Sequence, residues 1–166
     1  MTNVYYDYLD SPVGRLLLVA DGQGLRHLAF ERGRHPTPVD DDWQHKPGAL
    51  RETRAQLKAY FAGKLREFDL PLAPQGTDFQ RRVWRELLRI PYGATASYGD
   101  IARAVGEPNA SRAVGAANGL NPIAIVVPCH RVIGANGTLT GYGGGLPNKK
   151  FLLELEQKNS AFALTP

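Results

Sequence analysis

The chain contains a single cysteine, Cys129, among its 166 residues. A lone cysteine cannot form an internal disulfide bond, and it cannot anchor a cysteine-rich zinc site. The four histidines, His27, His35, His45 and His130, are scattered without the spacing of metal ligands. We therefore expect neither a metal site nor any other cofactor.

Long apolar runs are missing as well. No run approaches the ~20 residues that a transmembrane helix needs. Residues 1–9 lack the basic-then-apolar pattern of a secretory signal peptide. Hydrophobic residues still make up 43% of the chain, which is enough for a folded core. These features predict a cytoplasmic protein without a membrane partner.

Positive charge is scarce in the first half of the chain and concentrated in the second. Residues 1–75 carry ten basic and ten acidic side chains, whereas residues 76–166 carry ten basic and six acidic ones. The second half therefore holds the whole net charge of +4. A neutral half joined to a basic half indicates contact with a polyanion, although a mildly biased surface would look the same.

The pattern of hydrophobic residues predicts an α+β fold in two parts. Residues 1–73 are expected to form a small domain with an antiparallel sheet and one helix. Its elements are predicted over residues 4–9, 14–20, 25–30 and 67–72 as strands and over 49–61 as a helix. Residues 76–166 are expected to form a mainly helical domain.

The second part begins with a capping box, in which Thr77 precedes Gln80 by three residues and opens a helix through residue 88. Two short helices, over 97–106 and 110–118, flank a tight turn and form a helix-turn-helix candidate. The second of them consists almost wholly of small residues. Such a helix can pack closely against another helix or enter a DNA groove, and its one charge, Arg112, is either a salt-bridge partner or a DNA probe.

Pro128-Cys129-His130-Arg131 is the stretch with the most chemical information. A free cysteine is usually a small buried hydrophobe, but a nearby base makes it a nucleophile. His130 could act on Cys129 through a water molecule if a third group orients it. Glu156 on the last predicted helix, over 148–157, is a candidate, with an exposed carboxylate like that of Glu154 as the alternative. Residues 123–127 look like a buried extended segment that leads to Cys129.

Several stretches of the second half resemble one family. They are Ser97-Tyr98-Gly99, Ala113-Val114-Gly115-Ala116-Ala117-Asn118-Gly119, Asn121 to Val132 around the cysteine, Gly141-Tyr142-Gly143-Gly144-Gly145, and Lys149 to Glu156. Together they resemble the O6-alkylguanine-DNA alkyltransferases, also called methylated-DNA–protein-cysteine methyltransferases. The likeness covers residues 76–157 well and the N-terminal region only loosely.

The resemblance implies a role for each matching residue near Cys129. Cys129 accepts the alkyl group, His130 takes its proton through a water molecule, and Glu156 polarises His130. Asn121 braces the segment beside the active site. Tyr98 donates a proton toward N3 of the departing guanine, because a poor leaving group departs more easily when its developing charge is neutralised.

The resemblance also implies how the substrate is held. The main chain of Cys129 and Val132 accepts hydrogen bonds from the amino group of the base, and the pocket wall is formed by Tyr142, Gly143 and Gly144. Arg112 enters the duplex and takes the place of a flipped base. The slim helix enters the minor groove. Its groove-facing residues are Ala110, Ser111, Ala113, Gly115 and Ala116.

The implied reaction is direct reversal of DNA damage. An alkyl group moves irreversibly from O6-alkylguanine in double-stranded DNA to Cys129 after base flipping, once per protein molecule. O4-alkylthymine is a second substrate that the resemblance raises. The expected protein is a monomer without an obligate protein partner, able to assemble cooperatively on DNA. Two rival hypotheses stay open from the residues alone: a helix-turn-helix binder without enzymatic activity, and a cysteine hydrolase that uses Cys129 and His130.

Overall fold

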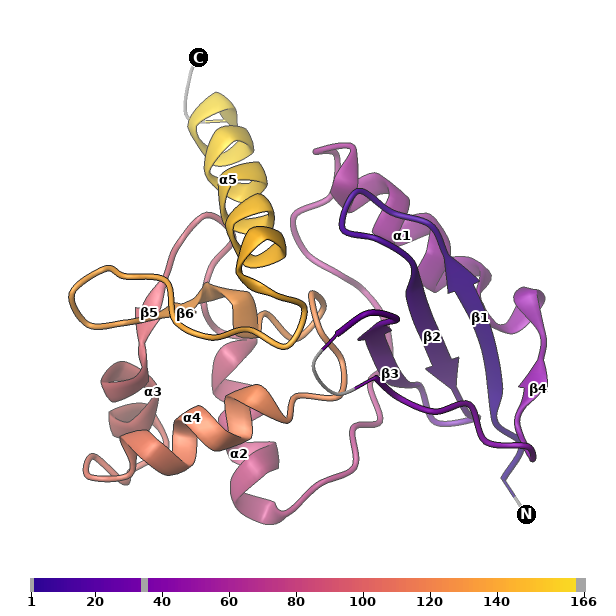
Figure 1. The fold of residues 1–166 in the computed structure, drawn as a ribbon, viewed down its shortest axis with the longest axis horizontal. Helices are drawn as coiled ribbons and strands as arrows, with labels where there is room; N and C mark the ends of the chain where they lie inside the picture. Colours follow the sequence, from indigo (N-terminus) through magenta and orange to yellow (C-terminus); the bar gives the residue numbers. More distant parts are fainter. Residues whose placement is uncertain (1, 34–35, 164–166) are drawn as a thin grey trace.

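The structure is a computed structural model that describes residues 2–33 and 36–163, with side chains through residue 160. Figure 1 shows two parts side by side: a small sheet with one helix, and a group of helices that contains the second half of the chain. This arrangement confirms the predicted α+β class. The division into domains at residues 73 and 76 stays a prediction.

The first part is built on a four-stranded sheet with the order β3-β2-β1-β4. The strands are β1 (Tyr5–Leu9), β2 (Leu16–Ala20), β3 (Leu25–Phe30) and β4 (Gln44–His45). The first three pair antiparallel, as predicted, and β4 runs parallel to β1. Strand β4 was not predicted, because it has two residues, both exposed, within a polar stretch.

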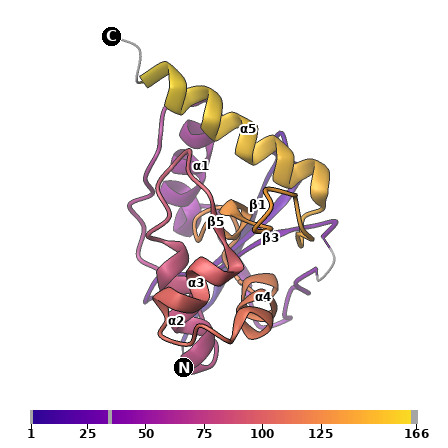
Figure 2. The same cartoon turned by 90° about the vertical axis from the view of Figure 1, so that its left-hand side faces the viewer.

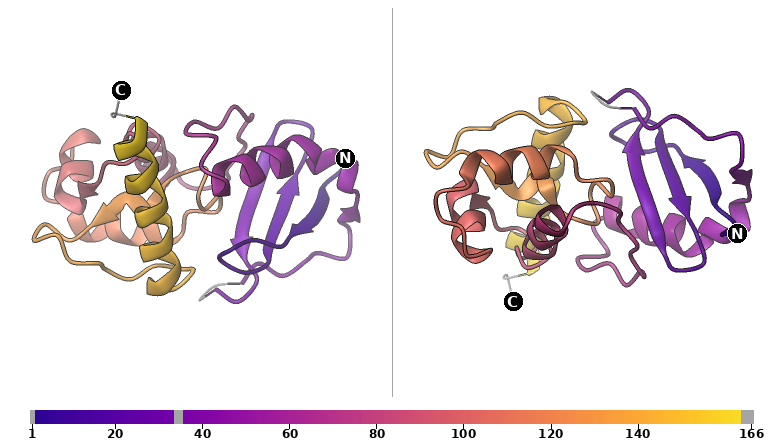
Figure 3. Two further views of the ribbon diagram at one scale, coloured as in Figure 1. Left: turned by 90° about the horizontal axis from the view of Figure 1, so that it is seen from above. Right: turned by 90° about the horizontal axis from the view of Figure 1, so that it is seen from below.

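Helix α1 (Arg51–Phe61) follows the short 3-10 helix η1 (Pro47–Leu50) and lies along one face of the sheet (Figure 3). Leu57 and Tyr60 point from α1 into the same core as Leu16 and Leu18 of β2. The opposite face of the sheet carries a smaller apolar cluster that includes Leu17. Strand β2 is therefore buried on both faces, which explains its unbroken run of apolar residues.

Two predicted extended segments are wrong. Within residues 67–72, only Leu72 forms a bridge, to Leu25 of β3. The amide of Leu25 bonds to the carbonyl of Pro71, whose own nitrogen has no hydrogen to extend a ladder. Residues 123–127 form a turn and not a strand, because Ile125 adopts a left-handed conformation with φ of 70°.

The second part contains α2 (Asp78–Leu87), α3 (Tyr98–Ala104), α4 (Ser111–Gly119) and α5 (Leu146–Ala163), with a small parallel sheet of β5 (Ala96–Ser97) and β6 (Val132–Ile133). The predicted capping box at Thr77 and Gln80 is confirmed, and Ser97 begins α3 with a second one. Helix α5 extends beyond the predicted residues 148–157 at both ends. Figure 2 shows α2, α3 and α4 packed together with α5 beyond them.

One hydrophobic core runs through both parts of the molecule. At their junction, Leu28 of β3 pairs with the turn that precedes the cysteine: its amide bonds to the Pro122 carbonyl at 2.9 Å, and the Ala124 amide bonds to its carbonyl at 3.0 Å. The first sheet is thereby joined directly to the segment that carries Cys129. Within the described ranges, no helix is long and apolar enough to cross a membrane.

Candidate active site

Cys129 begins a short 3-10 helix, η2 (Cys129–Arg131), and is 5% exposed. The turn before it is held by Asn121, whose side-chain nitrogen donates to the Val127 carbonyl at 2.8 Å. The side-chain oxygen of Asn121 accepts from the amide of Ile123 at 3.0 Å. One amide side chain therefore closes both ends of the turn. A β-branched residue with positive φ, here Ile125, needs such support because that conformation is strained.

His130 and Glu156 meet in the interior, although α5 brings Glu156 from far along the chain. The Nε2 atom of His130 lies 2.7 Å from Oε2 of Glu156, and both side chains are almost completely buried. Burial raises the pKa of the Glu156 carboxyl, but hydrogen bonds with His130 and Arg131 outweigh it and lower the pKa to about 2. Glu154, in contrast, is exposed. Of the two alternatives for Glu156, the structure has the buried one.

The ionised Glu156 determines which nitrogen of His130 carries a proton. A carboxylate can only accept, so His130 donates from Nε2 and keeps Nδ1 as a free acceptor. This Nδ1 atom is buried and has no hydrogen-bond partner among the described residues. Burial lowers the pKa of His130, against the opposing effect of Glu156. The neutral imidazole has the form that a base requires.

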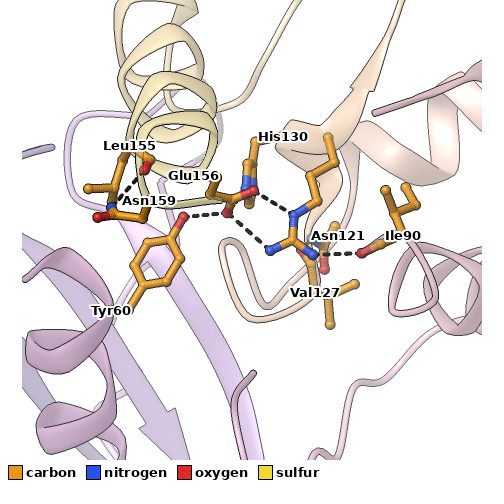
Figure 4. A network of polar contacts seen from close by, with 9 residues as sticks. Tyr60, Ile90, Asn121, Val127, His130, Leu155, Glu156 and Asn159 are labelled. Carbon is orange, nitrogen blue, oxygen red and sulfur yellow. Dashed lines mark hydrogen bonds and ion pairs between the residues drawn. The ribbon is translucent and has the colours of Figure 1, made fainter. Parts of the chain in front are cut away.

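Two further side chains bond to Glu156, and the sequence analysis assigned a role to neither (Figure 4). Arg131 donates from Nε to Oε1 at 2.7 Å and from Nη2 to Oε2 at 3.1 Å. Tyr60 of α1 donates its hydroxyl to Oε2 at 2.6 Å. Arg131 stands in the motif around Cys129, which was a signal for it. Tyr60 had only the apolar spacing of a helix to mark it, so sequence placed it in the core.

The thiol of Cys129 is held in its protonated form. Burial raises the pKa of Cys129, although the Asn121 side chain and the positive charge of Lys149 oppose this shift. Lys149 is itself fully buried and donates from Nζ to the Val132 carbonyl at 2.6 Å. Because the thiolate is the reactive form, Cys129 needs a base close by.

A pocket of about 230 Å³ opens at Cys129. Strand β3 lines one side of it and the loop 141–144 lines another. Phe30 of β3 and Tyr142 of the loop meet edge to face, with ring centroids 5.6 Å apart. A side chain at Gly144 would come within 2.7 Å of the Phe30 ring, so the close approach of loop and strand requires glycine there. Asn121 and Gly143 also line the pocket.

Tyr98 and Val132 lie outside the lining of this pocket. The hydroxyl of Tyr98 forms a 2.6 Å hydrogen bond with Thr140, which the sequence analysis did not single out. The Val132 carbonyl already accepts from Lys149, and the Cys129 carbonyl accepts from the Val132 amide. Each carbonyl keeps a second lone pair for another donor. Asn121, Cys129 and the glycine loop therefore line one pocket, whereas Tyr98 and Val132 do not line it.

Helix α4 has two distinct faces. Val114 and Ala117 are buried toward α2, where Trp84 donates to the Ala117 carbonyl at 2.9 Å. The opposite face is exposed and consists of Ser111, Arg112, Ala113 and Ala116, beside the half-buried Ala110 and Gly115. Arg112 forms no ion pair with any residue that the structure describes. Small residues therefore serve helix packing on one face and leave a slim, open surface on the other.

No group of three or more His, Cys, Asp or Glu side chains among the described residues could hold a metal ion. The carboxylate of Glu156 is instead bonded to His130, Arg131 and Tyr60. The chemistry available from these residues is nucleophilic: a buried thiol, an adjacent neutral imidazole and an ionised carboxylate behind it.

Comparison with known proteins covers nearly the whole chain. The sequence model of the 6-O-methylguanine DNA methyltransferase DNA-binding domain matches residues 78–158, and that of the ribonuclease-like domain of the same proteins matches residues 4–74. A methylated-DNA–protein-cysteine methyltransferase of Methanosarcina acetivorans is 55% identical over 92% of this chain and 98% of its own length. One of Mycobacterium bovis is 54% identical over 98% of each chain.

Solved structures agree. The crystal structure of Mycobacterium tuberculosis O6-methylguanine methyltransferase is 55% identical, covers 94% of each chain and superimposes with a TM-score of 0.87. The protein OGT of the same organism, in complex with DNA, is 54% identical over 93% of this chain and 94% of that one, with a TM-score of 0.88. The chain therefore belongs to the 6-O-methylguanine DNA methyltransferase family, whose members repair DNA by direct transfer of an alkyl group to a cysteine.

Proposed function

We propose that this protein binds double-stranded DNA and transfers the alkyl group of O6-alkylguanine to Sγ of Cys129. The observation that carries the proposal is the position of Cys129: the only cysteine of the chain lines a pocket, and its neighbour His130 is bonded to a buried, ionised Glu156. O4-alkylthymine would enter the same pocket as a second substrate. The protein acts as a monomer in the cytoplasm and can assemble cooperatively along DNA.

The proton of the Cys129 thiol goes to His130. Nδ1 of His130 is the free acceptor, and a bridging water molecule carries the proton to it. Glu156 stabilises the imidazolium that forms. The thiolate then attacks the alkyl carbon: the Sγ–C bond forms while the bond from that carbon to O6 breaks. Asn121 keeps Cys129 in place by holding the turn in front of it.

The guanine that leaves carries negative charge, which Tyr98 neutralises by donating its phenolic proton toward N3. The carbonyls of Cys129 and Val132 accept from the amino group of the base through their second lone pairs. Tyr142, Gly143 and Gly144 form the wall beside the base. Tyr98 and Val132 do not line the pocket itself.

The exposed face of α4 is the surface that enters the minor groove. O6 lies in the base stack on the major-groove side, so the nucleotide must rotate out at a cost of about a few kcal/mol. Arg112, exposed and without an ion pair in the described structure, fills the space that the base leaves. The small side chains of Ala110, Ser111, Ala113, Gly115 and Ala116 let the helix backbone approach the groove floor.

The thioether on Cys129 is stable to every group near it, so each protein molecule reacts once. The added alkyl group also enlarges a side chain in a packed site, which typically costs about 1–3 kcal/mol. The alkylated protein is therefore less stable than the free one. Equal melting temperatures of the two forms would contradict this part of the proposal.

The deciding experiment measures intact mass after incubation with an oligonucleotide duplex that contains O6-methylguanine. We expect a gain of one methylene group that peptide mapping assigns to Cys129, and no gain in the Cys129→Ser variant. No gain at any excess of wild-type protein would refute the proposal. A DNA binder without activity also gives no gain, whereas a cysteine hydrolase turns over an acyl substrate many times.

A further inference from the structure

The carboxylate of Glu156 is bonded from both parts of the molecule. Its Oε2 atom accepts from Tyr60 at 2.6 Å, from His130 at 2.7 Å and from Arg131 at 3.1 Å, while Oε1 accepts from Arg131 alone. Tyr60 stands 96 positions before Glu156. Among the described residues, it is the only group of the first 75 that bonds to the proposed catalytic side chains.

The Tyr60 hydroxyl is fixed in direction and in charge. Its ring is fully buried and packs against Phe61, Phe68 and Tyr92, with centroids 5.3, 5.4 and 6.3 Å away. Burial and the negative charge of Glu156 raise the pKa of Tyr60 far above its ordinary value, so the phenol remains a donor. The protonated Tyr60 hydroxyl therefore donates to Oε2 of Glu156, the same oxygen to which His130 is bonded.

Donors that share one oxygen compete for its electron density. A hydrogen bond to an ionised carboxylate stabilises the charge and makes that carboxylate a weaker base. Tyr60 therefore reduces the pull of Glu156 on the proton at Nε2 of His130, and it limits how strongly an imidazolium is favoured. The same bond keeps the carboxylate from turning away from His130.

We propose that Tyr60 is a positioning residue for the transfer, which holds Glu156 in place and keeps His130 neutral before reaction by sharing its oxygen partner. This rests on the proposed function, which makes His130 the base. The first part of the chain then does more than support the second: it supplies one member of the polar network behind the thiol.

The other charged groups around the pair come from the second part of the chain. His130 faces Glu156 and Lys149 from α5 and lies beside Arg131 in η2. Tyr92, between α2 and α3, also faces Glu156 and Arg131, and its buried hydroxyl has no hydrogen-bond partner among the described residues. All of these remain unchanged when the Tyr60 hydroxyl alone is removed, so a change in the titration of His130 reports on that hydroxyl.

The test uses the full chain with Tyr60→Phe and, as a matched control, Tyr8→Phe, which removes a phenolic hydroxyl from β1 outside the network. Two quantities are measured: the pKa of His130 by NMR titration without DNA, and the pH dependence of single-turnover methyl transfer from an O6-methylguanine duplex. In Tyr60→Phe we expect the pKa of His130 and the acidic limb of the rate profile to rise by about half a unit. The plateau rate should fall about threefold, because Glu156 loses its anchor. Tyr8→Phe should change neither.

A second variant keeps the fold and should shift the pKa of His130 in the opposite direction. Site-specific replacement of Tyr60 by 3-fluorotyrosine leaves the ring and hydroxyl but makes the phenol a stronger donor, so the pKa of His130 should fall. An unchanged His130 pKa in both variants overturns the inference, and so does a lower plateau rate with an unmoved acidic limb. If the wild-type protein transfers no methyl group, the proposed function fails. The NMR titration separates that result from a failure of the Tyr60 coupling.

Discussion

The two parts of this molecule bury different kinds of side chain. The first part buries mainly apolar residues, with the sheet covered on both faces, and Asp7 is the one buried carboxylate among its described residues, at 7% exposure near the sheet edge. The second part buries His130, Arg131, Lys149 and Glu156 within a short distance of Cys129. Buried charge is costly, so its concentration beside one thiol marks the region where chemistry, and not stability, governs the choice of residues.

The contrast is incomplete, because the first part also reaches the site. Phe30 forms part of the pocket wall, and Tyr60 bonds to Glu156. The sheet and α1 therefore help to shape the pocket and to hold the polar network. Substitutions in each part should separate these contributions, since some will change stability alone and others will change the transfer reaction.

The largest effect is expected for Glu156→Gln. The change leaves Arg131 buried without a charged partner, which should lower the free energy of unfolding by about 3–5 kcal/mol. Urea denaturation at neutral pH measures the loss, and transfer should become very slow in whatever protein folds. If the free energy of unfolding falls by less than about 1 kcal/mol, Arg131 does not depend on the charge of Glu156.

The same residue predicts a pH dependence. The pKa of Glu156 falls from 4.5 in the unfolded chain to about 2 in the folded protein. Its contribution to stability is therefore complete above pH 4.5 and is lost as the pH falls toward 2. The stability gap between wild-type protein and Glu156→Gln should narrow across this window. A constant gap in urea titrations between pH 5 and pH 2 would contradict the assignment.

Phe30→Ala should have the next largest effect. Removal of this buried ring from the core costs about 3 kcal/mol and opens the wall opposite Tyr142. Leu17→Ala, on the other face of the sheet, is the matched control with a similar loss of stability. Below the melting temperature of both variants, only Phe30→Ala should weaken binding of free O6-benzylguanine. If the two variants bind the base equally well, the sheet stabilises the fold but does not shape the pocket.

Asp7→Asn should change stability and leave the reaction unaffected. Asp7 bonds to His45 and to Arg54, each at 3.0 Å, so the loss of its charge should cost about 1–2 kcal/mol. Thermal unfolding measures the cost. Because this group is separate from the Glu156 network, the rate of methyl transfer should equal that of the wild type, and a slower rate would show coupling from the far edge of the sheet.

Arg112→Ala is expected to leave stability within about 0.5 kcal/mol, since the side chain is exposed. It should nevertheless slow transfer from duplex DNA while leaving the reaction with free alkylated base nearly unchanged. Arg89→Ala removes the same charge from an exposed position on the surface and serves as control. Equal slowing on duplex and free base would contradict the role of Arg112 inside the duplex.

The sequence by itself determined the features that depend on neighbours along the chain. The capping box at Thr77, the helix start at Ser97, the β2–β3 hairpin and the paired helices α3 and α4 all follow from short-range rules, because caps and turns are closed within a few residues. The stretch around Cys129 was informative for the same reason: its cysteine, histidine and arginine are adjacent.

Only the tertiary structure decided which residues from distant parts of the chain lie near Cys129. Whether Glu156 was buried or exposed could not be read from helical spacing, and Tyr60 looked like an ordinary core residue of its helix. The turn at Ile125 was mistaken for a strand because its left-handed conformation is imposed by Asn121 and by pairing with Leu28. Apart from the bonds of Asn121 within the turn, these contacts join residues far apart in sequence, and their energies depend on burial that no local pattern records.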